Sequence, residues 1–103
     1  MQITTILPSG ESRTWEVSTS KLTYAEHWDL LRDEIEKDGG PDVSLLEFVR
    51  VEHDGREKTL IVDENGIMMG RSINPKASEI YGRSSLIFGA ALLVDGKKFD
   101  ILD

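Results

Sequence analysis

Residues 45–63, LLEFVRVEHDGREKTLIVD, decide the fold of this chain. Apolar and polar side chains alternate over residues 45–53 around Phe48, Val49 and Val51, which is a pattern typical of a strand. Asp54-Gly55 follows, and this dipeptide favours a type I′ turn because both central residues of that turn need positive φ. Residues 58–63 then form the returning strand. We therefore predict an antiparallel hairpin in the middle of the chain.

Turn-forming residues predict two more hairpins. Residues 3–6 and 14–17 are rich in residues that favour strands, and they flank the turn sequence Pro8-Ser9-Gly10. Asn65-Gly66 has the same turn chemistry as the central dipeptide. It predicts that residues 67–69 run back along the sheet as a short strand.

Capping residues mark the ends of two helices. Thr23 is followed three residues later by Glu26, which is a capping box, and Gly39-Gly40-Pro41 ends the same segment. Asn74-Pro75 predicts the start of a second helix of about two turns, which Gly82 ends. The first helix is amphipathic and faces the sheet with a stripe at helical spacing, formed by Tyr24, Trp28, Leu31 and Ile35.

The last third of the chain contains a run of apolar residues, 86–94. A strand that is apolar on both faces is expected in the centre of a sheet. Gly89-Ala90-Ala91 lowers the side-chain bulk inside it, which lets another group pack closely there. Asp95-Gly96 predicts a last hairpin, with Phe99 and Ile101 in its returning strand.

These elements predict a single α+β domain over residues 1–103, with a mixed sheet of five to six strands, one main amphipathic helix and one short helix. The order of the elements resembles a β-grasp domain. The opening Met1-Gln2-Ile3 and the segment Glu16-Val17 are similar to ubiquitin. Since the chain ends in Ile101-Leu102-Asp103 without a diglycine, the resemblance does not imply conjugation to other proteins.

Composition and charge exclude several classes of protein. With 39% hydrophobic and 30% charged residues the chain has the composition of a folded domain, and without cysteine it has no disulfides or thiolate zinc sites. Its net charge of −7 argues against direct nucleic-acid binding. The start lacks a signal-peptide pattern, and no apolar run reaches the roughly 20 residues of a membrane helix. We therefore expect a cytoplasmic protein with no membrane association.

Three segments resemble a known family, namely residues 62–70, 74–82 and 88–94. They are similar to an uncharacterised domain of unknown function found in small phage, plasmid and bacterial proteins. In that family an acidic Asn/Glu-Gly turn precedes an Asn-Pro-x-Ala-Thr/Ser segment that ends in Tyr-Gly, and a glycine-containing apolar strand follows. Ser78 stands where the family more often has threonine. The resemblance implies an origin in mobile elements, and the host cytoplasm as location if the protein is phage-encoded; the family has no established reaction.

The first candidate binding surface is the solvent side of the long helix. Residues 23–38 include six acidic and two basic side chains. Carboxylates spaced one turn apart form an electronegative strip that can dock on a basic surface or imitate a nucleic-acid backbone, although an ordinary solvated face has the same pattern. The candidate partner-binding residues are Glu26, Asp29, Asp33 and Glu36.

The second candidate surface is the start of the short helix. Free amide donors at a helix N-terminus, together with nearby positive charge, can hold an anionic group such as a nucleotide phosphate. The same residues are also explained as a cap, a packing contact and an anchor. The candidate ligand-binding residues are Arg71, Asn74, Lys76, Ala77 and Tyr81.

The sequence contains no pattern of a catalytic or metal site. His27 and His53 are the only histidines, and neither has a partner at the spacing of metal ligands, so we expect no metal. No nucleophile elbow, phosphate loop or dinucleotide fingerprint is present, so we expect no cofactor and no enzyme.

We therefore predict a non-enzymatic, acidic accessory protein of phage or mobile-element type that binds a host protein, as an inhibitor or an acidic mimic. The alternative is a small-ligand or nucleotide-binding module that uses the helix start at Asn74-Pro75. An unrecognised enzyme is the third interpretation. An exposed sheet edge could also support a homodimer, because unpaired strand amides recruit another chain.

Overall fold

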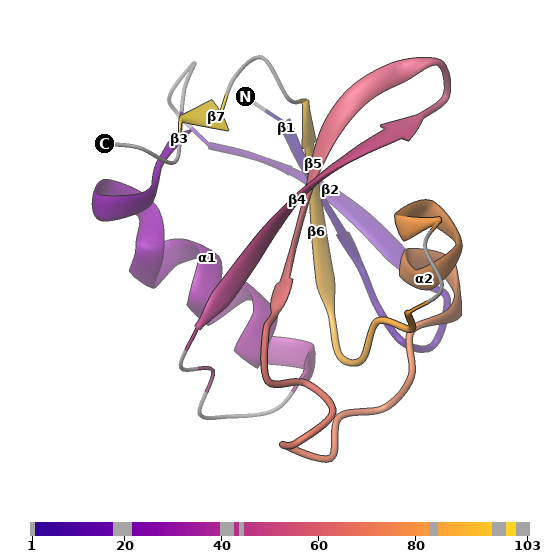
Figure 1. The fold of residues 1–103 in the computed structure, drawn as a ribbon. Coiled ribbons are helices and arrows are strands. Elements are labelled where there is room, and N and C mark those ends of the chain that lie inside the picture. Colours follow the sequence, from indigo (N-terminus) through magenta and orange to yellow (C-terminus); the bar gives the residue numbers. More distant parts are fainter. Residues whose placement is uncertain are drawn as a thin grey trace.

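A five-stranded antiparallel sheet with a helix against each face forms the body of the protein in a computed structural model (Figure 1). The structure describes residues 2–17, 22–39, 43, 45–82, 85–95 and 99–100, and for residues 22–28, 38, 39, 95, 99 and 100 the backbone alone. In chain order the elements are β1 (Gln2–Ile6), β2 (Ser12–Glu16), β3 (Leu22–Thr23), α1 (Tyr24–Gly39), β4 (Leu46–His53), β5 (Arg56–Asp63), α2 (Pro75–Tyr81), β6 (Ala91–Asp95) and β7 (Phe99–Asp100).

The α+β class and the five strands of the sheet are confirmed. The strand order is β2-β1-β6-β5-β4, and every neighbouring pair is antiparallel. A mixed sheet contains at least one parallel pair of strands. Within the described ranges, the parallel pair is β3 with β7, which lies outside the main sheet. The antiparallel pairing of β1 with β6, the last strand of the five-stranded sheet, also departs from ubiquitin-like β-grasp topology, in which the corresponding strands are parallel.

Both hairpins predicted before residue 64 are confirmed. At the central turn Asp54 has φ 55° and Gly55 has φ 74°, as a type I′ turn requires, and His53 pairs with Arg56. In the first hairpin Ile6 pairs with Ser12. The loop between these strands is closed by a hydrogen bond of 2.9 Å from Gly10 N to Leu7 O.

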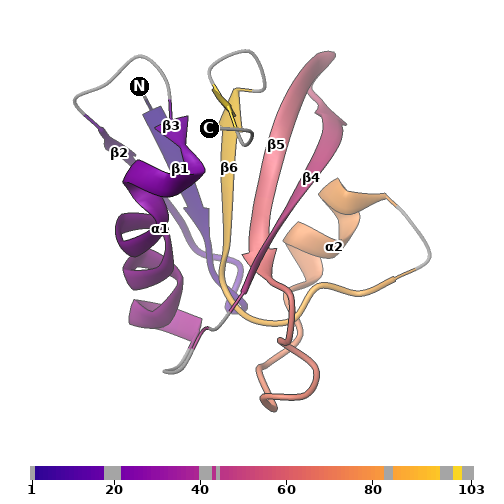
Figure 2. The same cartoon turned by 60° about the vertical axis from the view of Figure 1, so that its left-hand side comes forward.

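Helix α1 covers one face of the sheet, and α2 covers part of the other (Figures 1 and 2). Leu31 and Ile35 are fully buried against the sheet, which confirms the predicted orientation for these two residues, while the side chains of Tyr24 and Trp28 lie outside the described part. The core beneath α1 consists of Ile3, Leu31, Ile35, Val43, Leu46, Ile61, Leu92 and Val94. The core beneath α2 consists of Ile6, Val49, Val51, Leu60, Val62, Ala77, Ile87, Ala91 and Leu93.

A buried carboxylate on α1 also connects the helix to the sheet. Glu34 Oε1 accepts hydrogen bonds from Thr5 Oγ1 (3.2 Å) and Arg13 Nη2 (2.7 Å), and Oε2 accepts one from Lys37 Nζ (3.2 Å). Thr5 Oγ1 in turn accepts a hydrogen bond of 2.8 Å from Trp15 Nε1. Burial alone would raise the pKa of Glu34, but the hydrogen bonds and charges of Arg13 and Lys37 outweigh it and hold this pKa below its ordinary value of 4.5.

The predicted strand at residues 67–69 is wrong. Residues 64–70 form consecutive turns, closed by hydrogen bonds of 3.0 Å from Met69 N to Asn65 O and from Arg71 N to Gly66 O. Neither Asn65 nor Gly66 has the positive φ of a type I′ turn. Asp63 Oδ1 instead accepts a hydrogen bond of 2.9 Å from Asn65 N, which closes a side-chain turn at this point.

The predicted strand over residues 86–94 is shorter than expected. Strand β6 begins at Ala91 because Gly89, shortly before it, adopts φ 90°. In the segment before Gly89, Phe88 pairs with Ile73 instead of continuing the strand. The remaining strand lies between β1 and β5, so its central position is confirmed. Part of the predicted last turn, residues 96–98, lies outside the described residues. The predicted returning strand, β7, pairs with β3 rather than with β6.

Helix boundaries agree with the capping residues. Asn74 caps α2, and Gly82 follows it with φ 69°. Helix α1 begins directly after Thr23, although its capping side chains lie outside the described part. In the portion of the chain that the structure describes, no helix has the length and apolar character needed to cross a membrane.

Candidate functional site

The loop between β5 and α2, residues 64–74, projects from the end of the sheet opposite the β4–β5 turn (Figure 2). Its base is held by an ion pair of 3.1 Å between Asp63 Oδ2 and Arg71 Nε, whose side chains are 0% and 4% exposed. The other carboxylate oxygen of Asp63 accepts the hydrogen bond from Asn65 N. One buried carboxylate therefore ties together the beginning and the end of the loop.

The loop is also pinned to the segment before β6. A Cβ atom on Gly66 would lie 2.6 Å from Phe88 O, so only glycine permits this approach of the two backbones. Gly89 N donates a hydrogen bond of 2.7 Å to Ser72 O. Side-chain carbons of Arg71 lie 3.5 Å from the position of a Cβ on Gly89, so Arg71 is the group that packs over the small residues there.

Asn74 anchors the far end of the loop. Its side chain is fully buried, and Nδ2 donates to Ile6 O (3.0 Å) and to Gly89 O (2.9 Å). Oδ1 accepts a hydrogen bond of 3.1 Å from Ala77 N. The amide thus joins β1, the Gly89 segment and the start of α2.

This anchored loop presents large apolar side chains to solvent. Ile67 is 69% exposed, Met68 85% and Met69 44%, and Leu86 on the adjoining segment is 53% exposed. We call these four residues the apolar tip. Single exposed apolar residues are common on protein surfaces, but a group of them carried by a firmly held loop is typical of an interaction site.

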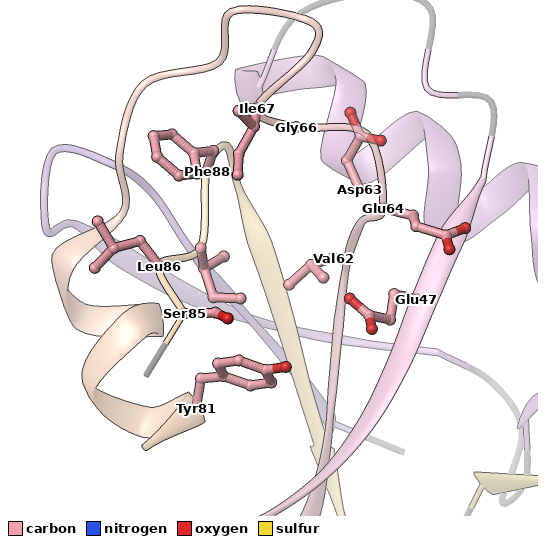
Figure 3. A pocket seen from close by; sticks show the side chains of 11 residues that line it. Glu47, Val62, Asp63, Glu64, Gly66, Ile67, Tyr81, Ser85, Leu86 and Phe88 are labelled. Carbon is pink, nitrogen blue, oxygen red and sulfur yellow. The ribbon is translucent and has the colours of Figure 1, made fainter. Parts of the chain in front are cut away.

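A hollow with a volume of about 240 Å³ lies beside the apolar tip (Figure 3). Ile67, Leu86 and Phe88 lie on one side of the opening, and Glu47 and Glu64 lie on the other. Val62 and Tyr81 also line it. The volume is below the roughly 300–1,000 Å³ of typical small-molecule pockets, so the hollow suits a side chain better than a whole ligand.

The predicted acidic strip on α1 is smaller than the sequence suggests. Asp29 and Asp33 are exposed, but Arg32 Nη2 lies 3.5 Å from Asp29 Oδ1 and 3.4 Å from Asp33 Oδ1. Glu36 Oε2 accepts a hydrogen bond of 2.9 Å from Val43 N, which ties the helix to the start of the next segment. The side chain of Glu26 lies outside the described part. Of the four predicted residues, Asp29 and Asp33 therefore remain as exposed carboxylates, and both lie beside the guanidinium of Arg32.

The five residues predicted to bind an anion do not converge on one opening. Arg71 is buried against Asp63, Asn74 is buried with its amide engaged, and Ala77 is buried in the core. Lys76 is exposed, and Tyr81 lines the hollow described above. The structure therefore gives Arg71, Asn74 and Ala77 roles in the fold.

His53, the histidine whose side chain the structure describes, does not form part of a cluster of potential metal ligands. His53 Nε2 lies 3.4 Å from Asp54 Oδ2 at the central turn, and the side chain of His27 lies outside the described part. Among the side chains that the structure describes, no three His, Asp or Glu residues are grouped as metal ligands.

Sequence reasoning missed the residues of the apolar tip and, except for Tyr81, the residues that line the hollow. The available signal was an uninterrupted apolar triplet, residues 67–69, between Asn65-Gly66 and Gly70. Such a triplet inside a turn-forming region has no buried face to occupy, and runs of exposed apolar residues are usually functional. The positions of Glu47 and Leu86 beside the triplet depend on strand pairing and carry no local signal.

No family model, curated protein or solved structure matches this chain. The resemblance to the family of phage and plasmid proteins over residues 60–94 therefore stays a prediction.

Proposed function

We propose that this chain is a non-enzymatic binding protein that docks on another protein through the apolar tip. The observation that carries the proposal is the exposure of Ile67, Met68 and Met69 on a loop whose base is tied by the buried Asp63–Arg71 pair. A loop without a binding role gains nothing from holding apolar side chains in water, since their exposure does not stabilise the fold.

The energy available at the apolar tip is sufficient for a protein interface. Complete burial of an Ile, Leu or Met side chain contributes about 1.5–3 kcal/mol, and a few such anchors dominate the affinity of many complexes. The contacts of Asp63, Gly66 and Asn74 order the loop before it meets a partner. A preordered loop loses less conformational entropy on binding.

The sequence resemblance supports one kind of partner. The three segments similar to phage and plasmid proteins, residues 62–70, 74–82 and 88–94, are the segments that form the loop, its anchoring helix and the strand beneath it. We propose that the partner is a protein of the host and that binding inhibits or redirects it. The exposed carboxylates of Asp29 and Asp33 on α1 are a second candidate contact surface, which would support binding to a basic region.

Site-specific photocrosslinking in the cell tests the proposal. A photoreactive residue is placed at position 68, at position 33, or at position 54 in the turn at the opposite end of the sheet. We expect one protein to be crosslinked from position 68, and its adduct to disappear when Ile67 and Leu86 are replaced by serine. Adducts from position 33 alone would move the interface to α1, and equal labelling from all three positions would contradict a specific site.

A further inference from the structure

We infer that the hollow beside the apolar tip receives a lysine or arginine side chain of the partner, from a segment that also carries apolar residues. The inference rests on the proposed function, because it names the chemistry of the segment that the apolar tip would contact. It starts from the two-sided lining of the hollow, which is apolar at Ile67, Leu86 and Phe88 and acidic at Glu47 and Glu64.

The acidic side of the hollow is open to a cation. Glu47 and Glu64 are both exposed, and in Figure 3 the carboxylate of Glu47 is directed into the opening. Among the residues that the structure describes, neither glutamate has a cation within ion-pair distance, whereas Glu34 and Glu57 are both paired. The field at the hollow is therefore negative, and it attracts a positively charged group.

The apolar side of the hollow matches the other part of a lysine or arginine. These side chains bury an apolar stem and keep the charged end at a polar boundary. In the hollow, the stem would lie against Leu86 and Phe88 and the charged end would reach Glu47. Apolar neighbours in the same segment would then cover Met68 and Met69, which follow Ile67 in the chain and are exposed.

Charge also disfavours two other occupants. A second copy of this chain carries the same net charge of −7 and would bring its own Glu47 and Glu64 to the interface. Nucleic acid would bring phosphates to the same carboxylates. A cationic, partly apolar protein segment is the occupant that complements both sides of the hollow.

NMR titration of the isotope-labelled full chain tests the inference with three short peptides. The probes are acetyl-Leu-Arg-Leu-amide, its Leu-Gln-Leu analogue without the charge, and its Ser-Arg-Ser analogue without the apolar neighbours. We expect saturable shifts of the amides of Glu47, Glu64, Leu86 and Phe88 with the first peptide, and weaker binding of the other two. Added salt should weaken the arginine peptide because it screens the carboxylates.

Matched variants then show which carboxylate interacts with the positive charge of the peptide. Glu47→Gln should weaken the arginine peptide roughly 2- to 5-fold, in the range of an exposed ion pair, and Glu64→Gln should weaken it less, because in Figure 3 the carboxylate of Glu64 is directed away from the opening. Glu52→Gln is the control, because Glu52 is exposed on β4 but lies on the opposite face from Glu47. Equal binding of the arginine and glutamine peptides, or equal effects of Glu47→Gln and Glu52→Gln, would overturn the inference.

The two proposals fail in different ways. Capture of a partner from position 68 without a preference of the hollow for the arginine peptide would overturn the role of the hollow and leave the apolar tip supported. Specific binding of the arginine peptide without crosslinking from position 68 would support the hollow and contradict the apolar tip as the docking surface.

Discussion

Arg71 Nε lies 3.1 Å from Asp63 Oδ2, and both side chains are withdrawn from solvent at the base of the loop that carries the apolar tip. An ion pair at this depth loses the hydration of both charges, so it contributes little net stability compared with an apolar pair. Its effect is positional, because the charges are satisfied only when residues 63 and 71 meet. The pair therefore favours the loop conformation in which residues 63 and 71 are in contact.

Arg71→Met should destabilise the protein by about 3 kcal/mol, because it leaves the carboxylate of Asp63 buried without its partner. The double variant with Asp63→Asn should recover part of this loss. Arg50→Met is the control, since Arg50 pairs with Glu57 at an exposed site and should contribute less than about 1 kcal/mol. Urea unfolding measures all three. A similar loss for Arg71→Met and Arg50→Met would contradict the positional role of the pair.

The lowered pKa of Glu34 predicts a specific acid sensitivity. A carboxyl with a lower pKa in the folded state stabilises the protein fully above its unfolded value of 4.5, and it loses this contribution as the pH falls through the folded value. Glu34→Gln should therefore be less stable than the parent at neutral pH, with a smaller further loss on acidification. Unfolding free energies measured from about pH 7 to about pH 3 check this. Parallel pH profiles of the two proteins would refute it.

Two glycines in one loop should respond differently to alanine. At Gly66 a Cβ would meet Phe88 O at 2.6 Å, so Gly66→Ala must separate the loop from the segment before β6. At Gly70 a Cβ has open space, and the strain comes from φ 70° alone, which costs about 1–2 kcal/mol. We expect Gly66→Ala to be the more destabilising change in thermal unfolding, and to shift the NMR signals of Phe88. The reverse order would mean that the two segments are not in close contact.

Asn74→Ala should cost more than the loss of a helix cap. The cap itself contributes about 1 kcal/mol, and the change also removes the donors that satisfy Ile6 O and Gly89 O. We expect a total of about 2–4 kcal/mol in urea unfolding. Lys76→Ala, at an exposed position in the same helix, should stay within about 0.5 kcal/mol. A loss near 1 kcal/mol for Asn74→Ala would show that the two carbonyl contacts contribute nothing.

Met68→Ser should separate binding from stability. Because Met68 is 85% exposed, the substitution should change the unfolding free energy by less than about 0.5 kcal/mol. It should nevertheless weaken capture of the crosslinked partner by the purified protein at least several-fold. A variant that binds as well as the parent would remove Met68 from the interface, and a variant that unfolds would show that the loop depends on it.

Elements with local signals could be predicted from the sequence. Asp54-Gly55 supplies the two positive φ angles of its turn, Asn74 and Gly82 supply the ends of α2, and Leu31 and Ile35 share a helix face at any tertiary arrangement. The α+β class follows from such signals because each depends on residues a few positions apart. The acidic composition of α1 was equally visible, although the position of Arg32 among its carboxylates lowers the charge that the helix presents.

The sequence by itself determined the first two hairpins, the positions of α1 and α2, and the burial of Leu31 and Ile35. Only the tertiary structure decided that Asn65-Gly66 opens a loop instead of a hairpin, and that Ile67 to Met69 face solvent. The reason is distance along the chain: Gly66 packs against Phe88, and Asn74 donates to Ile6 O, which is 68 residues away. Local turn preferences contribute less free energy to the loop conformation than these contacts, so the contacts determine the course of the loop.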